Sequence, residues 1–183
     1  CDCQAPSEKN RKAGAEGVHH FNYATDTAGK DRQYADTMRH VRAYHNHPAL
    51  LCWGAGNEVT LNIDTDPEKE AYAKFLEHVV QGIKSIDTSH PVASVSAWST
   101  DWPWWLRHTP SLDIYGINTY GYGAAAIPGE AERLHVARPY LVTEFGAPGE
   151  WEAKPDANGV RVEPDDALKA SIICPGFHDL IEA

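Results

Sequence analysis

The stretch ALLCWGAGNEV, Ala49–Val59, is a run of apolar and small residues that ends on an amide beside a carboxylate. Its first part, Ala49–Gly54, does not alternate between apolar and polar residues, which predicts a strand buried on both faces of a parallel sheet. A chain that leaves a hydrophobic core can end on any polar residue, so Asn57 and Glu58 decide nothing alone. Their meaning depends on how the other strands end.

Helices are predicted on both sides of this strand. Before it, apolar residues recur at helical spacing over Asp31–His45, and His47–Pro48 ends that helix. After it, an N-cap aspartate at Asp66, followed by proline, begins a helix that runs to Asp87. Its apolar residues form one face: Tyr72, Phe75, Leu76, Val79, Val80, Ile83 and Ile86. The other expected elements are strands at Pro91–Ala97, Leu112–Asn118 and Tyr140–Phe145, helices near Trp102–Arg107 and Glu130–His135, an irregular segment at 1–17, a loop at Ala147–Pro164 and a last helix from Asp165. One helix followed by four β-α units indicates parallel strands joined by right-handed crossovers.

Every predicted strand ends, at its carboxyl end, in residues suited to chemistry. These ends are Asn57–Glu58, Ala97–Trp98–Ser99, Asn118–Thr119–Tyr120 and Thr143–Glu144. A doubly wound sheet and a (β/α)8 barrel both fit the order of elements, but barrels place catalytic groups at the ends of several different strands. No Gly-rich phosphate loop follows any strand, which counts against a nucleotide-binding sheet. We therefore expect an α/β fold of the (β/α)8 TIM-barrel type.

The chain is short for a whole barrel. It has 183 residues, whereas a full barrel takes about 250. We expect an incomplete barrel that covers about strands 4 to 7, in a single partial domain at 1–183, with residues 174–183 as an atypical tail.

Two glutamates, Glu58 and Glu144, lie at the carboxyl ends of predicted strands and can face each other across the mouth of a barrel. A retaining glycosidase needs two carboxyl groups about 5–5.5 Å apart. One attacks the anomeric carbon, and the other protonates the leaving oxygen and then deprotonates water. A single glutamate after a strand is more often a solvated loop charge or a helix cap, so the hypothesis depends on the pair and its neighbours.

Three motifs resemble glycoside hydrolase family 2. NHPALLCWGAGNE (Asn46–Glu58) resembles the acid/base signature, in which a helix ends at an N-H-P-like turn and the next strand ends in Asn-Glu. RPYLVTEFGAPGEWE (Arg138–Glu152) resembles the nucleophile strand, and LDIYGINTYGYG (Leu112–Gly123) looks like the strand between them. Their order and separation, from Asp31 to about Ala170, match clan A of the glycoside hydrolases. Other families of that clan, including one of β-1,3-glucanosyltransferases, share the paired strand ends.

The resemblance implies a retaining O-glycosyl hydrolase that acts on β-glycosides by double displacement, with Glu58 as general acid/base and Glu144 as nucleophile. The substrate-binding residues that it implies are Asn57 at the sugar 2-hydroxyl, Asn118 lining the site, and Tyr120, or else Tyr122, donating to the nucleophile. The early barrel strands of the clan, with the arginine that supports the nucleophile, have no counterpart in this sequence. A fragment of this kind can be inactive alone.

Two tryptophans are the candidates for stacking against sugar rings. AWSTDWPWWLRH, residues 97–108, holds four tryptophans, and Trp98 is the one at a strand end. The other three are expected to pack a short helix onto the barrel. Trp151, in the loop after Glu144, is expected to form a further wall of the site.

The composition bounds the partners. The net charge is −10, and no basic run is longer than Arg11–Lys12, so neither nucleic acid nor a membrane is an expected partner. The expected partner is an oligosaccharide, polysaccharide or glycoside, with the oligomeric state open. Ten histidines show no zinc-ligand spacing, and we expect no metal and no cofactor. Four cysteines leave the redox compartment open, with a periplasmic or extracellular location slightly favoured over the cytoplasm.

Two alternative functions stay open at this point. A β-glucan transglycosylase would use the same two glutamates with a sugar, rather than water, as acceptor. A non-catalytic carbohydrate-binding fragment would keep the tryptophans without turnover. Elongated products on an oligosaccharide substrate separate the first from a hydrolase, and clear turnover excludes the second.

Overall fold

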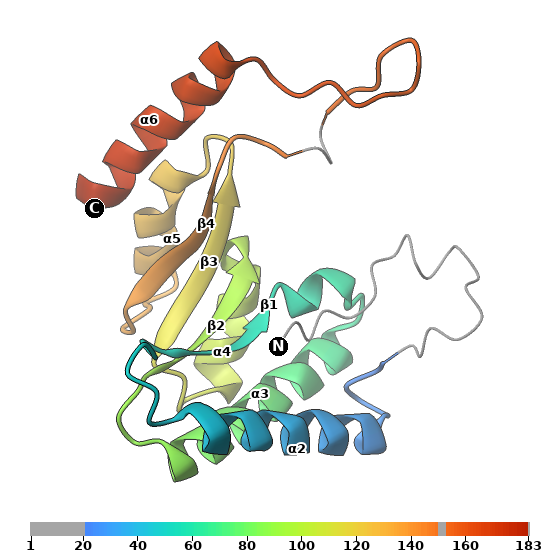
Figure 1. Ribbon diagram of the computed structural model, residues 1–183, viewed down its shortest axis with the longest axis vertical. Coiled ribbons are helices and arrows are strands. Elements are labelled where there is room, and N and C mark those ends of the chain that lie inside the picture. The colour runs from blue at the N-terminus through green and yellow to red at the C-terminus, as the bar shows by residue number, and fades with distance from the viewer. Residues whose placement is uncertain (1–20, 150–152, 183) are drawn as a thin grey trace.

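The computed structural model describes residues 21–149 and 153–182 (Figure 1). The elements, in chain order, are α2 (Thr27–Tyr44), β1 (Trp53–Asn57), η1 (Val59–Asn62), α3 (Asp66–Ile86), β2 (Val92–Ala97), η2 (Trp98–Asp101), α4 (Trp102–His108), β3 (Ile114–Tyr120), η3 (Ala124–Ala126), α5 (Ile127–Arg133), β4 (Tyr140–Gly146) and α6 (Asp166–Glu182). This confirms the predicted order of one helix and four β-α units. The irregular segment expected at 1–17 lies outside the described residues. None of the described helices is long and apolar enough to cross a membrane.

The four strands form one parallel sheet in the order β1-β2-β3-β4. Strands that follow each other in the sequence are also neighbours in the sheet, as in a barrel, whereas the strand order of a doubly wound sheet reverses. The fold is therefore an incomplete barrel, with β1 and β4 as its outer strands. In Figure 1, α2 and α3 lie side by side at one end of the sheet and α6 lies at the other.

Helix α3 packs into the core through the apolar face that the sequence predicts. Its residues Tyr72, Leu76, Val79, Val80 and Ile83 are each at most 5% exposed. Burial of one such side chain contributes about 1.5–3 kcal/mol, so this face is a main source of stability.

Two tryptophans of helix α4 belong to the same core. Trp102 and Trp105 are buried, which confirms that they are structural. The ring of Trp105 meets that of Tyr115 on β3 edge-on, with 5.3 Å between the ring centroids. These contacts fix α4 against the sheet.

The strand predicted at Ala49–Gly54 is wrong in position and in burial. Strand β1 begins only at Trp53, because the apolar run starts in a turn in which the Leu50 N–H donates to the His47 carbonyl at 3.0 Å. Leu51, directly after this turn, is 82% exposed. Since β1 is an outer strand of the sheet, it is only partly buried.

The helix starts also differ from the prediction. Helix α2 begins at Thr27, because the carboxylate of Asp26 accepts a hydrogen bond from the Gly29 N–H at 2.7 Å and caps it. The N-cap of α3 is Thr65, so Asp66 lies inside the first turn. A carboxylate there still stabilises the helix, because it lies near the positive end of the helix dipole.

Helix α6 packs against the carboxyl end of β4. A Cβ on Gly176 would lie 2.7 Å from the ring of Phe145, so glycine permits this close approach. Residues 174–182, expected as an atypical tail, continue α6 to Glu182 with Pro175 inside the helix. Helix α5 begins at Ile127, earlier than the expected Glu130.

Candidate active site

A cavity of about 410 Å³ lies at the carboxyl ends of the strands. Its lining residues, Glu58, Leu61, Ala97, Trp98, Asn118, Tyr120 and Glu144, come from all four β-α units. The volume falls in the range of about 300–1,000 Å³ that is typical of small-molecule sites. The fold therefore brings both candidate carboxylates and three of the expected binding residues, Trp98, Asn118 and Tyr120, into one cavity.

Glu144 reaches this cavity because the register between β3 and β4 is irregular. Ile117 is aligned with Val142, but the next residue, Asn118, is aligned with Glu144, so Thr143 is an extra residue on β4. Successive side chains of a strand point to opposite faces, and a slip of one residue exchanges the faces. Without the extra residue, Glu144 would share the face of Thr119 rather than that of Asn118.

Glu58 follows a similar irregularity on β1. The register between β1 and β2 shifts between Gly54 and Asn57. Glu58 itself has a φ of 50°, and Trp98, directly after β2, has a φ of 60°. Left-handed backbone costs about 1–3 kcal/mol per non-glycine residue and is often found at functional sites. Two of the cavity residues therefore carry strained backbone where their strands end.

The hydroxyl of Tyr120 donates a hydrogen bond to Oε2 of Glu144 at 2.5 Å. This hydrogen bond, together with partial burial and the charges of Glu144 and Glu58, raises the pKa of Tyr120 to about 12. Tyr120 therefore keeps its proton, and stays a donor to the carboxylate, over the physiological pH range.

Asn118, from the same strand, contacts the other carboxylate. Its Nδ2 donates to Oε1 of Glu58 at 2.7 Å and to Oδ1 of Asn57 at 3.2 Å. The hydroxyl of Thr143 donates to Oδ1 of Asn118 at 2.7 Å, which fixes the orientation of the amide. Strand β3 thus contacts both carboxylates, Glu58 through Asn118 and Glu144 through Tyr120.

The remaining predicted site residues are placed differently from one another. Trp98 lines the cavity and is 43% exposed, with its indole over Gly123, where a Cβ would lie 1.8 Å from the ring. Asn57 does not line the cavity and is linked to it through Asn118. Trp151 lies outside the described residues.

Two residues beside the site were not recognised in the sequence. Leu61 lines the cavity, although an apolar residue after a strand is typical of the core. Asp101 is 2% exposed and accepts a hydrogen bond from the hydroxyl of Thr60. Burial raises the pKa of Asp101 to about 6, and the charge of Glu58 adds to the effect. In the sequence, Asp101 precedes a helix and resembles an ordinary cap.

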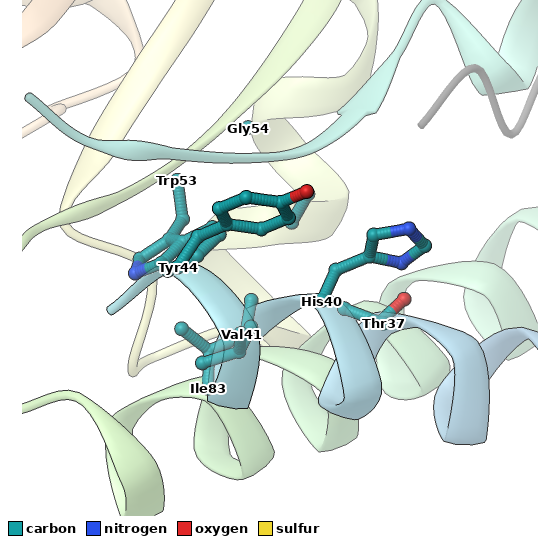
Figure 2. Close-up of a pocket in the computed structure, with 8 residues that line it drawn as sticks. Thr37, His40, Val41, Tyr44, Trp53, Gly54 and Ile83 are labelled. Atoms are coloured by element: carbon teal, nitrogen blue, oxygen red, sulfur yellow. The ribbon is translucent and has the colours of Figure 1, made fainter. Parts of the chain in front are cut away.

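A second cavity, of about 230 Å³, lies between α2 and β1 (Figure 2). The side chains of His40 and Tyr44 rise from α2 toward the ribbon of β1. Its lining residues are Thr37, His40, Val41, Tyr44, Trp53, Gly54, Ala55 and Ile83. It contains no carboxylate pair. Within residues 21–149 and 153–182, no group of three or more His, Cys, Asp or Glu side chains could hold a metal ion.

A family model described as "Glycosyl hydrolases family 2, TIM barrel domain" matches residues 4–149. The chain belongs to this family. The match includes every residue that lines the candidate site, so the paired carboxylates of this glycoside hydrolase family 2 chain lie within the family's barrel domain. A search of curated proteins by sequence found no match.

Solved structures of glycosidases share the fold. A β-glucuronidase of Bacteroides uniformis matches with a TM-score of 0.60 at 18% identity, over 84% of this chain and 19% of that one. A β-D-glucuronidase of Dictyoglomus thermophilum matches with a TM-score of 0.52 at 17% identity, over 82% and 27%. A β-galacturonidase of Eisenbergiella tayi, bound to galacturonate, matches with a TM-score of 0.52 at 18% identity, over 98% and 29%. This family 2 chain therefore spans less than a third of each of these structures.

Proposed function

We propose that this chain supplies the catalytic carboxylates of a retaining β-glycosidase, with Glu58 as general acid/base and Glu144 as nucleophile. The observation that carries the proposal is that both carboxylates line one cavity and each accepts a hydrogen bond from β3. Membership of glycoside hydrolase family 2 supports β-glycosidase activity in general.

In the first step, the Glu144 carboxylate attacks the anomeric carbon while the bond from that carbon to the leaving oxygen breaks. Glu58 gives its proton to the leaving oxygen. The Asn118 amide occupies Oε1 of Glu58, which leaves Oε2 to carry the proton. The Tyr120 hydroxyl occupies Oε2 of Glu144, which leaves Oε1 to form the bond to the sugar.

In the second step, Glu58 takes a proton from water, and the water oxygen replaces Glu144 at the anomeric carbon. The configuration of the sugar is thereby retained. Because Asn57 does not line the cavity, its proposed hydrogen bond to the sugar 2-hydroxyl, a contact that strengthens in the transition state, requires its side chain to move toward the sugar. Trp98 and Trp151 are the proposed stacking residues, since aromatic faces bind the apolar side of a pyranose.

The test uses the protein with its natural termini and a panel of 4-nitrophenyl β-glycosides. The panel includes glucoside, galactoside, mannoside and uronides, because the structural neighbours are named for uronides. Glu144→Ala is expected to abolish turnover, and Glu58→Ala to slow it by several orders of magnitude. Azide should restore Glu58→Ala by trapping the glycosyl-enzyme as a β-glycosyl azide, because azide needs no general base.

Glu70→Ala, on helix α3, is the matched control and should keep wild-type activity. Undiminished hydrolysis by Glu144→Ala refutes the assignment of the nucleophile. Longer oligosaccharide products would show that the same intermediate passes to sugar rather than to water.

A further inference from the structure

A large apolar side chain stands exposed beside the proposed acid/base. Leu61 is 62% exposed and lines the same cavity as Glu58 and Trp98. Single exposed leucines are common on protein surfaces and need no explanation in general. What distinguishes Leu61 is the way in which its backbone is held.

The short helix η1 is fixed on both sides of Leu61. Val59 is 1% exposed and belongs to the core, and the hydroxyl of Thr60 donates to the buried carboxylate of Asp101. The N–H of Leu61 donates to the carbonyl of Glu58 at 3.1 Å. Because its neighbours are anchored inward, the side chain of Leu61 is kept in the cavity rather than in the core.

Trp98 is held in a comparable way on the adjacent strand end. Its φ of 60° turns the chain directly after β2, and its indole lies over Gly123, where any side chain would collide with the ring. The cavity therefore has two large apolar side chains, from the ends of β1 and β2, whose positions are fixed by the surrounding backbone.

These two side chains lie on the Glu58 side of the site. Leu61 in η1 and Trp98 in η2 follow the neighbouring strands β1 and β2, and Glu58 also follows β1. Tyr120 and Glu144 belong to β3 and β4. In a double displacement, the general acid is beside the leaving group and the nucleophile is on the opposite face of the sugar. An apolar surface next to the general acid is therefore in position to contact the leaving group.

We propose that Leu61, with Trp98, forms a binding surface for the leaving group and selects β-glycosides that carry an aromatic or other apolar aglycone. This inference rests on the proposed function, because it requires Glu58 to be the general acid. It adds a specificity-determining residue that acts on one half of the reaction. The leaving group has departed before water attacks, so Leu61 has nothing to contact in the second step.

The experiment compares 4-nitrophenyl and methyl β-glycosides of one sugar, with wild type, Leu61→Ala, Leu61→Met and Leu51→Ala. Leu61→Ala is expected to lower kcat/KM for the nitrophenyl glycoside by about tenfold, from the loss of apolar contact. The value for the methyl glycoside should change by less than about twofold, because little apolar area is lost. Leu61→Met should retain most of the wild-type value, and Leu51→Ala, an exposed leucine outside the cavity, all of it.

A second measurement separates the two steps. With a 2,4-dinitrophenyl glycoside, whose leaving group is good enough to make the second step limiting, Leu61→Ala should raise KM and leave kcat unchanged. An equal loss of kcat/KM on the nitrophenyl and methyl glycosides, or a fall in kcat on the dinitrophenyl glycoside, overturns the inference. The proposed function still stands in that case if hydrolysis depends on Glu144. If the wild type hydrolyses none of the 4-nitrophenyl β-glycosides of the sugar panel, both proposals are refuted.

Discussion

Replacing Asp101 by asparagine should remove a pH-dependent loss of stability. Burial raises the pKa of the Asp101 carboxyl to about 6, whereas an aspartate in an unfolded chain titrates near about 3.9. Between these two pKa values the unfolded chain has lost the proton and the folded chain keeps it. Each unit of rising pH then lowers the free energy of unfolding by about 1.4 kcal/mol.

The gap of about two units between the folded and unfolded pKa values lowers the free energy of unfolding by about 3 kcal/mol. This loss begins above about pH 4 and is complete above about pH 6. The asparagine side chain of the variant does not titrate, and its amide oxygen can still accept the hydroxyl of Thr60. The free energy of unfolding of the wild type, minus that of Asp101→Asn, should therefore fall by about 3 kcal/mol between about pH 4 and pH 7.

The assay is urea unfolding followed by tryptophan fluorescence, at half-unit steps of pH, on both proteins. The difference between them cancels the carboxyl groups that they share, so it reports Asp101 alone. A difference that does not vary with pH refutes the reasoning, because the carboxyl would then titrate as in the unfolded chain. A difference that rises with pH shows that the protein stabilises the anion.

Three further predictions concern other parts of the molecule. Asp87→Asn should lower the free energy of unfolding by about 2–3 kcal/mol at neutral pH, because the buried carboxylate accepts hydrogen bonds from two side chains and two backbone N–H groups. Although burial opposes it, these bonds hold the pKa of Asp87 well below its usual range, so the wild-type advantage in urea unfolding should shrink as pH falls below about 4 and not as it rises. Tyr120→Phe should lower kcat on an aryl glycoside by about 10- to 100-fold with little change in KM, and a loss under about threefold would mean that the hydroxyl has no role in the transition state. Gly123→Ala should displace the indole of Trp98, since the new Cβ would lie 1.8 Å from the ring, and raise KM, while Gly129→Ala, with no atom within 4 Å of its Cβ, should leave kinetics unchanged.

The parts of the fold that were predicted from sequence are those that depend on local periodicity. The apolar face of α3 and the alternation of strands and helices repeat over many residues, so a few exceptions do not hide them. The start of β1 was missed because Leu50 and Leu51 are apolar residues that lie at the end of a turn and directly after it, before the strand begins. Whether such residues are buried depends on the neighbouring strands, and the identity of the residues alone does not determine it.

The residues of the candidate site were predicted from the sequence, but the strand irregularity that orients them was not. Polar residues at strand ends identified Glu58, Asn118, Tyr120 and Glu144 as neighbours, because the ends of parallel strands meet at one edge. The extra residue at Thr143, which turns Glu144 toward the cavity, has no signature in a single sequence. Their catalytic roles stay predictions until the variants are measured.

Glu58 directly follows β1 and Glu144 lies on β4, so the two carboxylates belong to the outermost strands of the sheet, with β2 and β3 between them. In a flat sheet, strand spacings of about 4.8 Å would place β1 and β4 about 14 Å apart, whereas double displacement needs carboxyl groups about 5–5.5 Å apart. In the proposed double displacement, the bending of the sheet therefore has to bring the two carboxyl groups to this separation. If Glu58 and Glu144 act as proposed, substitutions between the helices and the sheet that change this curvature, with no contact to the sugar, are expected to change the rate. The separation of the two carboxyl groups is therefore a property of the whole four-stranded sheet.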